Sequence, residues 1–194
     1  MHGRDYTGSL LEETYFGVSV DRKNRKAAED FFKMLSGSED VAATKGFLPF
    51  QKAVRFVKTF QPGTDPTMPS TKVARDLLDF VAEELDIDPD SEEAEELKFY
   101  TAVGSPLDRF HGVDAFIEYE DKRALIDVTM NPKKRFEDSS GNRIIMEQLP
   151  DYGVKEERAD YERELRKYAR AVVKILRPPV EHTKEYAESG VSLR

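Results

Sequence analysis

The sequence predicts an α/β (α+β) fold, in which a small mixed sheet is flanked by helices and preceded by an N-terminal helical extension. The first observation is a pair of segments with alternating apolar residues, 112–119 and 122–129, joined by a short polar turn; this pattern is typical of a β-hairpin. The second is helical periodicity on both sides of the hairpin, over 73–85 and 154–177. The third is helical periodicity within the first sixty residues. Together they place a sheet between helices.

The chain divides at a segment that interrupts regular structure. Residues 61–70 contain three prolines and a glycine, which break both helices and strands. We therefore predict an N-terminal helical region over 1–69, a core over 70–180 and a flexible tail over 181–194. At 194 residues the chain is long enough to bury a substantial core.

Composition narrows the class of protein. Hydrophobic residues at 39% and twelve Phe indicate a folded chain. The absence of Cys excludes disulfides and thiolate metal sites, which fits a reducing compartment. No apolar leader and no run of eighteen apolar residues occurs, so we expect a cytoplasmic protein with no membrane partner. The net charge of −8 opposes indiscriminate binding to polyanions, although a local basic patch can override it.

Two helices are expected in the N-terminal region. The first follows the basic run 22–26 and the second follows Pro49. Their apolar residues recur at helical spacing: Ala27, Ala28, Phe31, Phe32 and Leu35, then Phe50, Ala53, Val54, Val57 and Phe60. The basic run is compatible with nucleic-acid contact, but such runs more often form a solvated helix face.

The core is expected to open with a helix capped by Ser70 or Thr71, and Glu84 lies at the border of its apolar stripe. The stripe consists of Val73, Leu77, Phe80, Val81 and Leu85. A short acidic helix from Glu92 and a strand over 97–103 follow, and 143–149 is a further candidate strand. The last helix has an apolar side, formed by Leu165, Tyr168, Ala169, Val172 and Leu176, and a basic side that faces either phosphates or solvent.

The hairpin brings two acidic residues together. With Glu120 and Asp121 as the turn, Glu118 pairs with Arg123, and Asp114 falls opposite Asp127. Opposed carboxylates repel unless a cation lies between them, and oxygen ligands favour Mg²⁺ or Mn²⁺. Alternatively both carboxylates reach solvent and bind nothing, and a three-residue loop would shift the register by one.

This order of elements resembles the PD-(D/E)xK nuclease superfamily over about 70–134 and loosely over the helix that follows. The resemblance implies a restriction-endonuclease-like core that hydrolyses DNA with Mg²⁺ or Mn²⁺. It assigns the metal to Asp114 and Asp127, with Glu84 as the helix carboxylate that completes the site. Because nucleases of this kind are often dimers, the N-terminal helices are a candidate homodimer interface.

One position departs from the family pattern, because Thr129 stands where the resemblance implies a catalytic lysine. A hydroxyl can hydrogen-bond a water but carries no positive charge. Either Lys133 or Lys134 reaches back to the site, or metal binding is weak, or the fold remains without the chemistry.

Further residues are assigned to the substrate. Arg109, Lys134 and Arg135 are candidate phosphate contacts, since each lies near the same edge as the acidic pair. His111 is a candidate substrate contact, although a lone His before a glycine is more often structural.

Three functions remain open at this stage. The first is a metal-dependent nuclease. The second is a non-catalytic domain of the same fold that binds nucleic acid or a protein partner. The third is an adaptor whose Phe-rich N-terminal helices form a partner interface.

Overall fold

The computed structural model describes residues 6–38, 45–61, 65–130 and 141–178. The helices are α1 (Tyr6–Phe16), α2 (Arg25–Ser36), α3 (Phe50–Thr59), α4 (Lys72–Leu85), α5 (Pro106–His111) and α6 (Arg158–Leu176), with 3₁₀ turns η1 (Arg22–Asn24) and η2 (Glu92–Glu96). The strands are β1 (Lys98–Thr101), β2 (Ala115–Tyr119), β3 (Lys122–Val128) and β4 (Arg143–Met146). The predicted tail over 181–194 lies outside the described residues.

The four strands form one mixed sheet in the order β1-β2-β3-β4. The first three are antiparallel neighbours, whereas β4 runs parallel to β3. Within the hairpin, Tyr119 pairs with Lys122 and Glu118 with Arg123. The predicted mixed α/β architecture and the two-residue turn are therefore confirmed.

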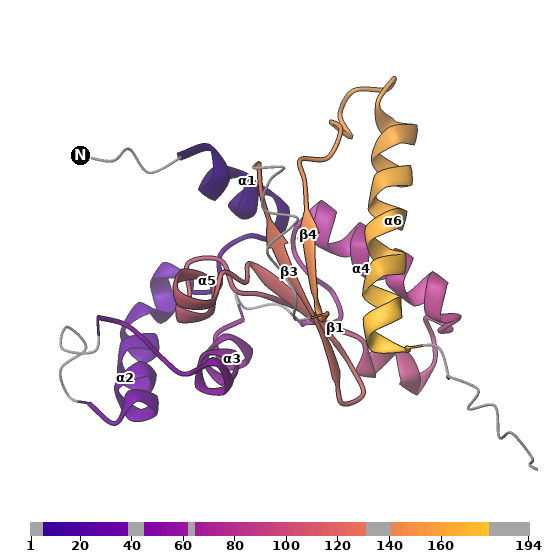
Figure 1. Cartoon of the computed structure of the whole chain (residues 1–194). Coiled ribbons are helices and arrows are strands. Elements are labelled where there is room, and N and C mark those ends of the chain that lie inside the picture. The colour runs from indigo at the N-terminus through magenta and orange to yellow at the C-terminus, as the bar shows by residue number, and fades with distance from the viewer. Residues whose placement is uncertain (1–5, 39–44, 62–64, 131–140, 179–194) are drawn as a thin grey trace, which may run out of the picture.

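Helices cover both faces of the sheet (Figure 1). On one face, α1, α4 and α6 pack against alternate strand residues such as Ile117 and Ile126. On the other face, α2 and α3 pack against Phe116 and Leu125. Because successive side chains of a strand point to opposite faces, the strands contribute residues to two hydrophobic cores. The N-terminal helices share these cores with the sheet, because Tyr15 and Phe16 of α1 belong to the first one.

The two long helices of the core, α4 and α6, pack against one another. All five residues predicted for the apolar side of α6 are buried, whereas Val73 and Phe80 of α4 are only partly so. Ala74 and Leu78 take their place in the core because the buried side of α4 is rotated slightly from the predicted stripe. Two basic residues of α6 and the arginine that follows it pair with acids: Arg166 with Glu83 at 2.6 Å, Arg170 with Glu84 at 2.9 Å and Arg177 with Glu93 at 3.4 Å.

Thr71 precedes α4, as predicted, but its hydroxyl does not cap the helix. It donates instead to the Tyr15 carbonyl oxygen at 2.5 Å, which ties the start of α4 to the end of α1. No helix in the described part of the chain is long and apolar enough to cross a membrane.

The end of α4 gives a test of local backbone strain. Asp86 closes the helix with φ of 60°, in the left-handed region. Because glycine adopts this region without steric cost, we expect Asp86→Gly to raise the free energy of unfolding by roughly 0.5–1 kcal/mol. Thermal unfolding measures the change. Asp86→Ala is the matched control, since it removes the same carboxylate but keeps a Cβ, and it should not stabilise. Equal effects of both variants would contradict the strain argument.

Candidate metal centre

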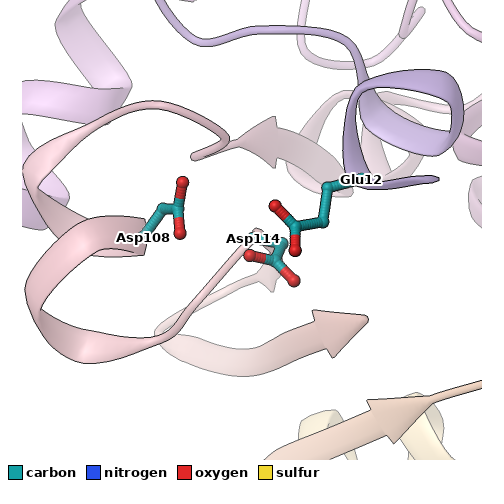
Figure 2. Close-up of side chains that lie close together, drawn as sticks. All are labelled: Glu12, Asp108 and Asp114. Atoms are coloured by element: carbon teal, nitrogen blue, oxygen red, sulfur yellow. The ribbon is translucent and has the colours of Figure 1, made fainter. Parts of the chain in front are cut away.

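Three carboxylates from separate elements converge at the end of the sheet away from the hairpin turn. Glu12 of α1, Asp108 of α5 and Asp114 just before β2 each offer an oxygen, and these oxygens lie within 4.8 Å of one another. Figure 2 shows the three side chains pointing toward a common space. Among the described residues, this is the group of three or more acidic or His side chains close enough to share a metal ion.

A β-bulge sets the position of the Asp114 carboxylate. Ala115 pairs with Ile126, yet the N–H of Asp114 also donates to the Ile126 carbonyl oxygen at 2.9 Å. Two residues of one strand therefore face one residue of β3, which is the pattern of a bulge. The Asp114 carboxylate then accepts from the Val128 N–H at 2.6 Å. The prediction that Asp114 pairs directly with Asp127 is therefore corrected. The regular pairing of β2 with β3 ends at Ala115 and Ile126, and the bulge shifts Asp114 out of that register.

The other two carboxylates are fixed by their own helices. Ser105 caps α5 by accepting from the N–H groups of Leu107 and Asp108. Within this turn, Asp108 accepts from the Gly104 N–H at 2.7 Å. Glu12 is positioned by the packing of α1, in which the Tyr15 hydroxyl accepts from the Leu149 N–H at 2.6 Å. Loop, helix and strand backbone together set the position of the site.

The carboxyl of Asp114, at the centre of the group, has a raised pKa. Asp114 is 3% exposed. Burial raises the pKa of its carboxyl to about 8, against a lowering by the Val128 hydrogen bond, and the charges of Glu12, Asp127 and Asp108 raise it further. A bound cation would relieve both the repulsion and the poor solvation of the carboxylate. The three carboxylates could therefore hold a metal ion through oxygen ligands.

Asp127 lies beside this group and has a cation close to it. Asp127 is 2% exposed, and its Oδ2 is 3.9 Å from a guanidinium nitrogen of Arg143 on β4. Arg143 also donates to the His111 carbonyl oxygen at 3.0 Å. Gly112, next to His111 in the chain, has φ of 60°, a left-handed conformation that favours glycine. The site thus combines four acidic residues with one arginine at its border.

Glu84 does not join the group. Its carboxylate accepts from Arg170 Nε at 2.9 Å, on the side of α4 that faces α6. A helix does contribute a glutamate to the acidic group, but the helix is α1 and the residue is Glu12. The physical reason is that α4 packs against α6, which holds its border carboxylate there.

The remaining predicted site residues are distributed around the centre. Thr129 is buried at the end of β3, where its N–H donates to the Met146 carbonyl oxygen at 2.8 Å. His111 has a structural environment: its Nε2 is 2.8 Å from the Leu48 carbonyl oxygen, and its ring contacts Phe47 and Phe50. Arg109 is exposed on α5. Lys133, Lys134 and Arg135 lie outside the described residues.

Sequence reasoning missed Glu12 and Asp108. Glu12 stands in an ordinary Leu-Leu-Glu-Glu stretch, about a hundred residues from its neighbours. Asp108 carried a weak signal, because Ser-Pro-Leu-Asp is a typical helix start that places a carboxylate six residues before Asp114. Comparison with protein-family models, with curated proteins and with solved structures gave no match.

Proposed function

We propose that this protein is a divalent-cation-dependent nuclease with a restriction-endonuclease-like core, which hydrolyses phosphodiester bonds in DNA. The observation that carries the proposal is the convergence of Glu12, Asp108 and Asp114, with Asp127 beside them, around a buried carboxyl whose pKa is raised. Such a group is unfavourable on its own and becomes favourable when it holds a cation.

The arrangement of elements supports the same class. The mixed sheet has helices on both faces, one acidic residue precedes its second strand and another lies on its third. These are the positions at which the resemblance to the PD-(D/E)xK superfamily places its metal ligands. A helix glutamate completes the acidic set, supplied by α1.

In this proposal Glu12, Asp108 and Asp114 hold Mg²⁺ or Mn²⁺. When bound, the ion supplies Lewis-acid stabilisation of the scissile phosphate and lowers the pKa of a water. Asp127 would add negative charge beside the three ligands, and Arg143, whose guanidinium lies 3.9 Å from Asp127 Oδ2, would contact the phosphate. Arginine stays protonated, so Arg143 holds and neutralises phosphate oxygens but cannot accept the proton of the attacking water.

The experiment is a cleavage assay with a matched pair of glutamate variants. Wild-type protein should hydrolyse labelled DNA only with Mg²⁺ or Mn²⁺. Glu12→Gln should reduce the rate by about a hundredfold, because it removes a metal ligand. Glu84→Gln, the same change on α4, should leave the rate nearly unchanged. Equal loss in both variants, or no metal-dependent cleavage by the wild type, would contradict the proposal.

Arg143 gives a separate prediction. We expect Arg143→Met to lower the cleavage rate by about tenfold or more, because a charged hydrogen bond to the phosphate is lost. Arg143→Lys should recover part of the rate. The metal-induced rise in melting temperature is the control, and both variants should keep it. An unchanged rate in Arg143→Met would show that this cation does not touch the reacting phosphate.

A second function is favoured by one observation. Thr129 is buried at the position of the family lysine and cannot supply its charge. A non-catalytic domain that binds nucleic acid or a protein partner through the same fold is therefore the alternative. It predicts metal binding or partner binding without hydrolysis by the wild-type protein.

A further inference from the structure

The negative charge of the chain is not spread evenly. Residues 20–60 contain nine Lys and Arg against five Asp and Glu, although the whole chain carries a net charge of −8. The cations of η1, α2 and α3 are exposed: Arg22, Lys23, Arg25, Lys26, Lys33, Lys52, Arg55 and Lys58. This basic layer covers the face of the sheet opposite α4 and α6 (Figure 1). A polyanion repelled by the rest of the molecule would be attracted here.

A pocket opens within the basic layer. It has a volume of about 400 Å³ and lies between α2, α3 and α5, within the range of about 300–1,000 Å³ that is usual for ligand pockets. The exposed ring of Phe110 lines it, together with the exposed side chains of Arg25 and Arg109. The rings of Phe32 and Phe56, which belong to the core, form its floor. Its one acidic lining residue, Glu29, is paired with Arg25 at 3.4 Å. We call this the α5 pocket.

The α5 pocket and the acidic group share a turn of the chain. Gly104 lines the pocket, and its N–H donates to Asp108, which belongs to the acidic group. Arg109 and Phe110, the next two residues of α5, also line the pocket. A ligand in the pocket therefore lies against the same turn of the chain that positions Asp108 of the acidic group.

We propose that the α5 pocket binds a base of a single-stranded nucleic acid, while the cations of the basic layer hold its phosphates. The exposed ring of Phe110 can stack on any base, and arginines contact phosphate oxygens or stack on the base. A base can enter such a pocket only when it is unpaired, so the preferred strand is single. The placement of the adjacent phosphodiester on Glu12, Asp108 and Asp114 rests on the proposed function.

The test measures affinity by fluorescence anisotropy, with labelled single-stranded DNA, single-stranded RNA and duplex DNA in the absence of divalent cation. Wild-type protein should bind at least one single strand about tenfold more tightly than the duplex. Arg109→Glu and Arg25→Glu should each weaken that binding by about tenfold and reduce its dependence on salt. Arg163→Glu on α6 changes the net charge equally and should have little effect. Thermal unfolding confirms that each variant is folded.

The outcomes separate this inference from the proposed function. Loss of binding in the pocket variants, together with no hydrolysis by the wild type, supports the binding site and removes the nuclease proposal. Metal-dependent hydrolysis that the pocket variants leave unchanged supports the nuclease and overturns the inference. Equal weakening by Arg163→Glu, or preference for duplex, also overturns it.

Discussion

Asp114→Asn is expected to lower metal-dependent DNA hydrolysis by about a hundredfold or more while the protein stays folded. Asn has the size of Asp, and its amide oxygen can still accept from the Val128 N–H. It lacks the negative charge that the proposed metal requires, and a lost ligand costs several kcal/mol of transition-state stabilisation. Cleavage rates at saturating Mg²⁺ and Mn²⁺ measure the effect.

The matched control is Asp121→Asn, which makes the same change in the exposed turn of the hairpin. It should cleave like the wild type. If Asp114→Asn retained most of the wild-type rate, the central carboxylate would not be a ligand, and the acidic group would have to be assigned a structural role.

The same substitution is expected to stabilise the protein when no divalent cation is present. The pKa of Asp114 is raised from about 4 to about 8, so between these pH values the native state binds a proton that the unfolded state does not. Stability conferred by protonated Asp114 is therefore lost as the pH rises through this window, by about 1.4 kcal/mol per pH unit. Over the whole window the penalty reaches roughly 5 kcal/mol. Asp114→Asn removes it.

Denaturant unfolding at several pH values in a chelator checks this result. The variant should exceed the wild type by several kcal/mol at pH 8.5, and the difference should shrink toward pH 4.5. Mn²⁺ should stabilise the wild type more at pH 8 than at pH 5, because protons compete with the ion for Asp114. A constant difference between the two proteins across pH would show that Asp114 is not buried in its protonated form.

Regular elements could be predicted because their signals are local. Apolar residues at alternate positions and a two-residue turn predicted the hairpin register, and Leu165, Tyr168 and Val172 at helical spacing predicted the buried side of α6. The bulge at Asp114 could not be predicted, since alternation carries no sign of an extra residue until the partner strand is known. The pairing of Phe116 with Leu125 could therefore be predicted from the sequence, whereas the position of Asp114 could not.

The composition of the candidate site depends on long-range packing. The prediction of Glu84 rests on its position on one helix, but the neighbour of that position is Arg170 of α6, which the sequence of α4 does not specify. Glu12 reaches the site because α1 docks through Tyr15 and Phe16 beside β3. No spacing rule joins residue 12 to residues 108 and 114, so this contact becomes visible only in three dimensions.

The most direct measurement is a crystal structure of the protein with Mn²⁺, recorded with anomalous diffraction. The proposal predicts an anomalous peak bound by carboxylate oxygens of Glu12, Asp108 and Asp114, and loss of that peak in Asp114→Asn crystals prepared in the same way. A site that stays empty at saturating Mn²⁺, or a peak held only by other residues, would contradict it.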